Sequence, residues 1–279
     1  MSDCRFSLTA GSVFKNRLVV ITLLFALPFS LNACAKESQV VPPSKASVVS
    51  STPSVTRITP PADVLFIGNS FTYYNDSLHK HVRLLLRAGK PLGDTRHRIR
   101  SMTLSGARLV EHSAGFEAIV DSHSWDAVVM QGHSLGPISE ETKQSFQDTA
   151  RAFDRYLDEQ GIQSALFMTW AYTGAPEMTQ KLDKSYTETG NELNALVVPV
   201  GRAFARVTQN HADIPLRISD KKHPSLAGSY LAACVFYASL YGQSPVGLSY
   251  TAGLDKAVAF KLQEAAADSV EEYFGYQLE

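Results

Sequence analysis

The sequence predicts a three-layer α/β/α sandwich built on a mainly parallel, flavodoxin-like, five-stranded sheet. From residue 62 onward, short apolar runs alternate with longer segments of helical periodicity. Apolar strands that alternate with helices typically form a parallel sheet with helices on both faces. No internal repeat and no second change in composition divides this stretch, so residues 62–279 are interpreted as one domain.

The first half of the domain contains three strand-like runs separated by two helical segments. The run "DVLFIG" at 63–68 ends in glycine and precedes a helix at 77–89, in which Leu78, Val82 and Leu85 share one face. Gly89 marks the end of that helix. A second strand at 97–104, a second helix at 107–120 and a third, buried strand at 125–132 follow along the chain.

The second half begins with the clearest helical pattern of the chain. Ser139 is a candidate N-cap with Glu140 and Glu141 in the first turn, and the helix is expected to end at Gly161. Its apolar face carries Phe146, Ala150, Phe153 and Leu157. Strands at 164–171 and 195–201 flank a polar helix at 176–192, and residues 220–279 are expected to be mostly helical.

Residues 1–33 have the pattern of a bacterial signal peptide. Arg5, Lys15 and Arg17 precede the apolar run 18–31, which is too short for a comfortable membrane span. "LNAC", which closes this run, resembles the lipobox of bacterial lipoproteins. The resemblance implies lipidation of Cys34 and an anchor in the outer membrane, since Ala35 and not an aspartate follows the cysteine. The alternative is an ordinary secretory peptide with a chance cysteine.

Residues 34–61 are expected to form a tether between Cys34 and the domain, because they are rich in Ser, Pro, Thr and Val without a sustained period. Cys234 lies in an apolar run and is interpreted as a small buried hydrophobe. The formal net charge of the chain is -1, so nucleic acid is not an expected partner. No HExxH or CxxC pattern occurs, so neither a metal nor another cofactor is expected.

Several chemistry-bearing residues follow the expected strands directly. Ligands of open parallel sheets bind beyond the carboxyl ends of the strands, which makes these positions candidates for a site. They are Ser70 after the first strand, Gly106 after the second, and Gln131, His133 and Ser134 after the third, with Asp220 and His223 in "SDKKHPS" near the end of the chain. The sequence thus predicts an active site that contains a hydroxyl, an imidazole and a carboxylate. On its own stretch, Ser70 is more typical of a turn or N-cap residue than of a nucleophile.

The pair of motifs "GNS" at 68–70 and "DKKH" at 220–223 resembles the SGNH or GDSL hydrolase superfamily of esterases and lipases. "GNSFTYYND" and "HPSLAGSYLAAC" look more specifically like a little-characterised bacterial branch of it. The resemblance implies that Ser70 is the nucleophile, that His223 is its general base, and that Asp220 orients the imidazole. Zinc is not implied, since His133 has no second ligand at metal spacing.

The resemblance also implies an oxyanion hole made by the amide of Ser70, the amide of Gly106 and an asparagine from a "GxND" block. In this chain the matching stretch reads "QGHSLG" and contains no asparagine. Gln131 is the favoured replacement, since its carboxamide offers an equivalent donor, and Ser134 is the second candidate. Loss of such a donor costs about 2.7 to 4 kcal/mol of transition-state stabilisation, so a replacement is expected in an active enzyme.

The resulting hypothesis is a lipid-anchored serine esterase that acts through an acyl-enzyme, with removal of O-acetyl groups from carbohydrate as the first expected reaction. An O-acyltransferase with the same triad is an alternative, because only the second nucleophile differs. A catalytically degenerate glycan-binding module is another alternative, and the altered "GxND" block is its motivation.

Overall fold

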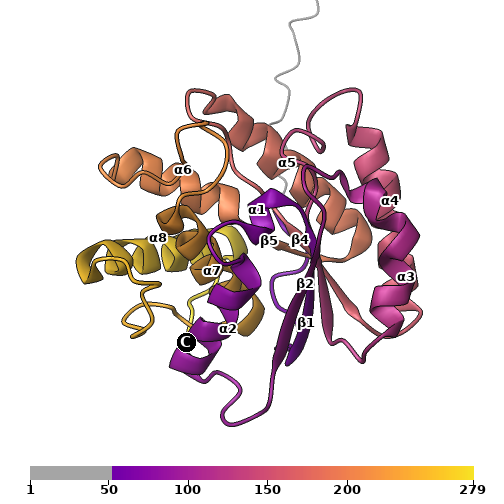
Figure 1. Cartoon of the computed structure of the whole chain (residues 1–279), viewed down its shortest axis with the longest axis horizontal. Helices are drawn as coiled ribbons and strands as arrows, with labels where there is room; N and C mark the ends of the chain where they lie inside the picture. Colours follow the sequence, from indigo (N-terminus) through magenta and orange to yellow (C-terminus); the bar gives the residue numbers. More distant parts are fainter. Residues whose placement is uncertain (1–51) are drawn as a thin grey trace, which may run out of the picture. The chain divides into compact units, whose positions relative to one another are not determined.

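The computed structural model describes residues 52–279 of the chain (Figure 1). The expected signal peptide, Cys34 and most of the expected tether lie outside the described residues. Among the helices of the described part, none is long and apolar enough to cross a membrane.

The core of the domain is a five-stranded sheet in which every pair of neighbouring strands is parallel. Its order is β2-β1-β3-β4-β5, which confirms the flavodoxin-like sheet predicted from the sequence. The strands are β1 (Asp63–Gly68), β2 (Arg98–Thr103), β3 (Ala127–Met130), β4 (Gln163–Phe167) and β5 (Leu196–Val198). Strand order changes direction at β1, because the chain goes first to β2 on one side and later to β3 on the other. The carboxyl ends of β1 and β3 therefore form the switch point at which α/β folds bind ligands.

Helices cover both faces of the sheet (Figure 1). On one face α7 (Leu226–Tyr241) packs against α2 (Leu78–Gly89) and α8 (Lys256–Phe274). On the other face α4 (Lys143–Asp158) packs between α3 (Ser113–Asp121) and α5 (Glu177–Leu193). The remaining helical elements are α1 (Ser70–Tyr73), η1 (Leu109–His112) and α6 (Val200–Asn210).

The helix α7 is the most deeply buried helical element, and its sequence explains why. Its residues are apolar nearly all round, so it has no polar face to turn toward water. Ser225 caps its N-terminus by accepting a hydrogen bond from Gly228 N, and Gly242 ends it in the left-handed region. Cys234 lies fully buried in this helix, and burial raises the pKa of its thiol to about 12, so the structure supports the interpretation of Cys234 as an unreactive buried side chain.

Two local predictions are wrong. Ser139 does not cap α4: the helix begins at Lys143, and the carbonyl of Ser139 accepts hydrogen bonds from the amides of Thr142 and Lys143 in a preceding turn. The helix α6 was not expected, because its first residues were included in the strand at 195–201. The backbone at Gly201 lies so close to the loop after β4 that an added Cβ would meet Thr169 O at 2.3 Å.

Residues 52–61, which the sequence analysis places in the tether, lie along the domain. The amide of Ser54 donates to Asn191 Oδ1 (2.7 Å), and the amide of Thr59 donates to Gln163 Oε1 (2.9 Å). The Arg57 guanidinium lies 4.1 Å from the centre of the Tyr276 ring. These contacts extend the packed part of the chain to residues before Ala62.

Candidate active site

Ser70 lies at the carboxyl edge of the sheet, where β1 ends and the single turn α1 begins. Asn69 is the N-cap of this turn, and its Oδ1 accepts a hydrogen bond from the amide of Phe71 (3.1 Å). The Ser70 side chain is therefore presented on a sharp strand-to-helix turn at the switch point between β1 and β3. The residue is largely buried, with 8% of its surface exposed.

Asp220 and His223 come from one tight loop between α6 and α7. The two ends of the loop are joined by a hydrogen bond from Ile218 N to His223 O (3.0 Å). Asp220 Oδ1 accepts hydrogen bonds from the amides of Lys222 (2.9 Å) and His223 (3.0 Å), so the carboxylate also closes the turn. Lys221 has a φ of +68°, which this sharp reversal requires.

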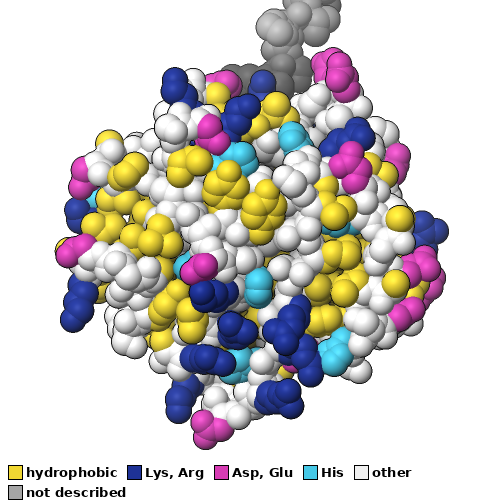
Figure 2. All heavy atoms as spheres, viewed as in Figure 1, with side chains coloured by type: hydrophobic (Ala, Val, Ile, Leu, Met, Phe, Trp, Pro, Cys, Tyr) yellow, Lys and Arg dark blue, Asp and Glu magenta, His cyan; other side chains and the backbone are white. Residues whose placement is uncertain are grey.

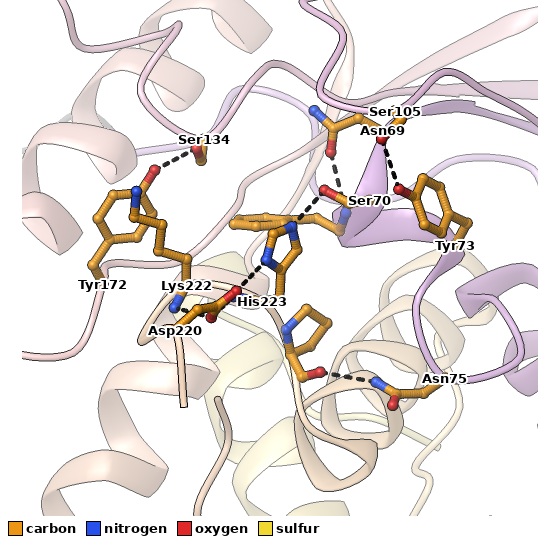
Figure 3. A network of polar contacts seen from close by, with 12 residues as sticks. Asn69, Ser70, Tyr73, Asn75, Ser105, Ser134, Tyr172, Asp220, Lys222 and His223 are labelled. Atoms are coloured by element: carbon orange, nitrogen blue, oxygen red, sulfur yellow. Dashed lines mark hydrogen bonds and ion pairs between the residues drawn. The ribbon is translucent and has the colours of Figure 1, made fainter. Parts of the chain in front are cut away.

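The structure brings Ser70, His223 and Asp220 into one chain of hydrogen bonds (Figure 3). His223 Nδ1 donates to Asp220 Oδ2 at 2.5 Å, and the Ser70 hydroxyl donates to His223 Nε2 at 2.8 Å. The acceptor on Nδ1 fixes the tautomer, because a neutral imidazole that donates from Nδ1 must accept at Nε2. Hydrogen bonds from the His223 ring and from the loop amides lower the pKa of Asp220 to about 2. The carboxylate is thus ionised at neutral pH.

Aromatic rings hold the imidazole in this orientation. The Tyr74 ring is stacked on His223 at 4.5 Å, and Phe71 meets the imidazole edge-on at 5.7 Å. Phe71 is in turn stacked on Trp170 at 4.4 Å. The Trp170 indole donates to Lys222 O (3.0 Å), so the same aromatic group holds both the ring of the histidine and the backbone beside it.

A second polar anchor holds the end of the loop that carries Asp220 and His223. Asn75 Nδ2 donates to Pro224 O (2.9 Å) and to Ser229 Oγ (2.8 Å), and His81 Nε2 donates to the carbonyl of Asn75 (2.6 Å). Asn75 and the two residues after it have φ values of +52°, +69° and +71°. Such a run is costly outside glycine, and the hydrogen bonds of Asn75 offset part of that cost. Sequence reasoning missed this anchor.

Two backbone amides beside Ser70 have no acceptor among the described residues. They are the amide of Ser70 itself and the amide of Gly106, whose φ is +67°. The loop that carries Gly106 is tied to the turn that carries Ser70 by the hydrogen bond from Asn69 Nδ2 to Ala107 O (2.9 Å). These two N–H groups are therefore available to an oxyanion, as the sequence resemblance implies.

The structure corrects the role expected for Gln131. Both hydrogens of its carboxamide are already used, one toward Asn69 Oδ1 (2.7 Å) and the other toward Gly132 O (3.0 Å). Gln131 Oε1 accepts from the amide of Asn69 (3.2 Å) and from the hydroxyl of Thr72 (2.7 Å), so the amide cannot be turned around. With 1% of its surface exposed, Gln131 has no donor left for an oxyanion and instead fixes Asn69.

Ser134 borders the site without joining the triad. Its hydroxyl shares a hydrogen bond of 2.5 Å with the hydroxyl of Tyr172, and Lys222 Nζ lies 5.1 Å from the centre of the Tyr172 ring. Figure 3 shows this group on the opposite side of His223 from Tyr73, whose hydroxyl shares a hydrogen bond of 3.0 Å with Ser105. No hydrogen bond in the described structure links Ser134 to the triad residues.

Within 52–279, no group of three or more His, Cys, Asp or Glu side chains is placed to hold a metal ion. Burial lowers the pKa of His133, the histidine that follows β3.

Comparison with known proteins finds similar chains among solved structures. No family model matches the sequence, and no curated protein matches it. Among solved structures, a "putative SGNH hydrolase" from Slackia heliotrinireducens is 26% identical with a TM-score of 0.53, over 64% of this chain and 98% of that chain. The fold and this likeness support the assignment of the chain to the SGNH/GDSL hydrolase superfamily.

Two further solved structures share the fold at lower identity. A DUF4886 family protein from Bacteroides uniformis is 20% identical with a TM-score of 0.59, over 78% of this chain and 96% of that chain. A variant of Axe2, an acetyl xylan esterase from Geobacillus stearothermophilus, is 18% identical with a TM-score of 0.53, over 67% of this chain and 97% of that chain.

Proposed function

We propose that this protein is a serine esterase that hydrolyses carboxylic esters through a Ser70–His223–Asp220 triad and an acyl-enzyme. The observation that carries the proposal is the continuous path from the Ser70 hydroxyl through His223 to the ionised Asp220. An unassisted serine hydroxyl is a weak nucleophile at neutral pH, and a base in direct hydrogen-bond contact is what activates it.

The reaction follows from the positions of these atoms. Ser70 Oγ attacks the ester carbonyl carbon while His223 Nε2 accepts the hydroxyl proton, and Asp220 stabilises the imidazolium that forms. The carbonyl oxygen becomes an oxyanion beside the amides of Ser70 and Gly106. The imidazolium then returns its proton to the leaving alcohol. Water attacks the acyl-enzyme by the same route and releases the acid and the free Ser70 hydroxyl.

For the substrate we propose an O-acetylated carbohydrate. A solved structure of the same fold is described as an acetyl xylan esterase. Figure 3 shows Tyr73 on one side of the proposed triad and Tyr172 on the other, and the Tyr74 ring is stacked on His223. Aromatic faces are suited to packing against sugar rings. The transferase alternative predicts acylated sugar products, which the same assay would detect if an acceptor sugar is present.

The direct test uses the mature chain, residues 34–279, produced without its lipid. Treatment with a fluorophosphonate should give a single adduct on Ser70, detected by peptide mass spectrometry. We expect p-nitrophenyl acetate hydrolysis to be lost in Ser70→Ala and adduct formation to be lost in His223→Ala. The matched control Ser122→Ala, an exposed serine at the end of α3, should keep both activities. A folded protein that forms no adduct would refute the proposal and favour the glycan-binding alternative.

We also propose that Cys34 carries a lipid that anchors the enzyme at the outer membrane. The "LNAC" motif and the following alanine support this. The test is labelling with radioactive palmitate in a bacterial host, followed by separation of the membranes. Label and outer-membrane location should both be lost in Cys34→Ala, and a labelled Cys34→Ala chain would refute the assignment.

A further inference from the structure

A pocket of about 810 Å³ lies beside the loop that carries Asp220 and His223, but the residues of the proposed triad do not line it. Its wall is formed by the segment after β4, by the C-terminal part of α6 and by residues 214–221. Apolar lining is supplied by Ile214, Leu216 and Ile218, with Ala205 on α6 facing them. A pocket of this size and composition is typical of a small-molecule site.

The charged side chains that line this pocket are all positive. Among residues 52–279, Arg217 and Lys221 are the only charged residues that line it, and none of the aspartates and glutamates in this range does so. Arg217 Nε donates to Ala171 O (2.8 Å), and Nη1 lies 3.5 Å from Thr208 Oγ1. No carboxylate of residues 52–279 forms an ion pair with Arg217. The pocket therefore presents a positive group without a counter-charge.

Arg202, another partly buried arginine, has the acidic partner that Arg217 lacks among the described residues. Arg202, on the same helix α6, meets Asp183 at 2.7 Å and is thereby compensated. Arg217 has only the Phe204 ring at 5.2 Å and neutral oxygen acceptors, and burial lowers the pKa of its guanidinium to about 10. A desolvated cation without an anion is unfavourable, so an anion that enters the pocket would recover part of that cost.

We propose that this pocket binds a monocarboxylate with an apolar body, whose carboxylate pairs with the Arg217 guanidinium. Arginine is suited to carboxylates because its planar N–H groups match their two oxygens. The apolar body would lie along Ile214, Leu216 and Ile218. The combination of one desolvated cation and a largely apolar wall favours an amphipathic acid over a multiply charged anion.

The pocket is built on the loop that carries Asp220 and His223. Arg217 pairs with Pro224 across the base of this loop, and Lys221 O accepts a hydrogen bond from Thr173 N (3.0 Å), in the segment that forms the opposite wall. A bound acid would thus contact both walls that hold the loop in place. Binding itself does not depend on the proposed esterase activity.

The test is calorimetric titration of octanoate into the mature chain with Ser70→Ala, so that turnover and acylation are excluded. We expect octanoate to bind, 1-octanol to bind more weakly, and octylammonium not to bind. Since a hydrogen bond to a charged group contributes about 1.5 to 3 kcal/mol, Arg217→Gln should weaken octanoate binding about 10- to 100-fold. Arg57→Gln, which removes an arginine from a different pocket, is the matched control and should leave binding unchanged.

A second variant keeps the test valid if Arg217→Gln fails to fold. Ala205→Phe leaves Arg217 in place but fills the pocket, and it should also abolish octanoate binding. Absence of octanoate binding to the Ser70→Ala chain, equal binding of octanoate and 1-octanol, or full binding to both pocket variants would overturn the proposal. Failure of fluorophosphonate labelling would refute the esterase but would leave this titration unaffected, so the two outcomes are distinguishable.

Discussion

Asp220 performs two tasks with its two carboxylate oxygens. One oxygen closes the loop through the amides of Lys222 and His223, and the other orients the imidazole of His223. Since both tasks need an acceptor and only the second needs a negative charge, they can be separated by a substitution that keeps the shape of the side chain.

The Asp220→Asn variant should fold normally and lose activity. The asparagine oxygen can still accept the loop amides, but its NH2 group faces His223 Nδ1 and favours the tautomer that cannot accept the Ser70 proton. We expect kcat for p-nitrophenyl acetate to fall about 10³- to 10⁴-fold, with an unchanged circular dichroism spectrum. A decrease of less than about 10-fold would show that Asp220 does not orient the base.

Gln131 supports the candidate site by holding Asn69 through hydrogen bonds. Gln131→Met keeps the volume but removes four hydrogen bonds from a buried position, so buried groups of Asn69 and Thr72 lose their partners. We expect a loss of about 2 to 4 kcal/mol in the free energy of unfolding, measured by urea denaturation, together with reduced activity. Gln144→Met, on the exposed face of α4, is the control and should change neither. Unchanged stability of Gln131→Met would contradict the network.

At the scale of elements, the segment between α1 and α2 anchors the loop that carries Asp220 and His223. Asn75 reaches from this segment to the backbone immediately after His223, across 149 residues of sequence. Its positive φ and the positive φ of the next two residues show that the segment is held in a costly conformation by such contacts.

Asn75→Gly tests this anchor, because glycine accepts the positive φ while the side-chain donor is removed. We expect kcat to fall about 10-fold with little change in KM, since the loop that carries His223 loses a positioning contact. Asn194→Gly is a matched control, because Asn194 also has a positive φ, +53°, but ends α5 away from the site. Equal activity of the two variants would show that the anchor does not affect catalysis.

Some of these helices and strands could be predicted from the sequence, and others could not. The strands β1 and β3 are predictable because their residues are apolar on both faces and are bounded by glycine. The helix α6 was missed because its first turn, Val200–Gly201, continues an apolar run and has no polar N-cap side chain, so the boundary with β5 depends on packing. Ser70, Asp220 and His223 could be found because they lie in two short motifs. The role of Gln131 could not, because it depends on which groups of Asn69 face it in the folded chain.

At the scale of the whole molecule, charge is unevenly distributed although the net charge is near zero. Figure 2 shows Lys and Arg side chains gathered over the region where Figure 1 draws α2 and β2. His79 lies within this region, where its Nδ1 contacts the hydroxyls of Ser77 and Ser101. Burial, followed by the positive charges of Arg83 and Arg100, lowers the pKa of His79 to about 4.

The domain should therefore lose stability in mild acid. Below pH 6.5 the unfolded chain protonates His79 while the folded chain does not. The free energy of unfolding therefore decreases as the pH is lowered from about 6.5 to about 4. His81 and His112, whose pKa values burial also lowers, act in the same direction. We expect His79→Gln to remove about 1 kcal/mol of the loss between pH 7.5 and pH 5, after allowance for its partial exposure. Urea denaturation at the two pH values measures this, with His97→Gln as the control.

An unchanged pH dependence in His79→Gln would contradict this account. The comparison is made as a difference between two pH values for each variant, so any general loss of stability from the substitution cancels. His97→Gln, in the loop before β2, should show the same pH dependence as the unmodified chain.

The three residues of the proposed triad come from two separate parts of the fold, one of which is the loop of residues 218–223. Asp220 and His223 lie in one small closed loop, while Ser70 lies on the turn that follows β1, so one hydrogen bond joins the proposed nucleophile to the proposed base. A displacement of the loop would lengthen that hydrogen bond while the pair of Asp220 and His223 moved together. For the proposed esterase, the alignment of nucleophile and base therefore depends on the position of one loop as well as on the identity of the three side chains.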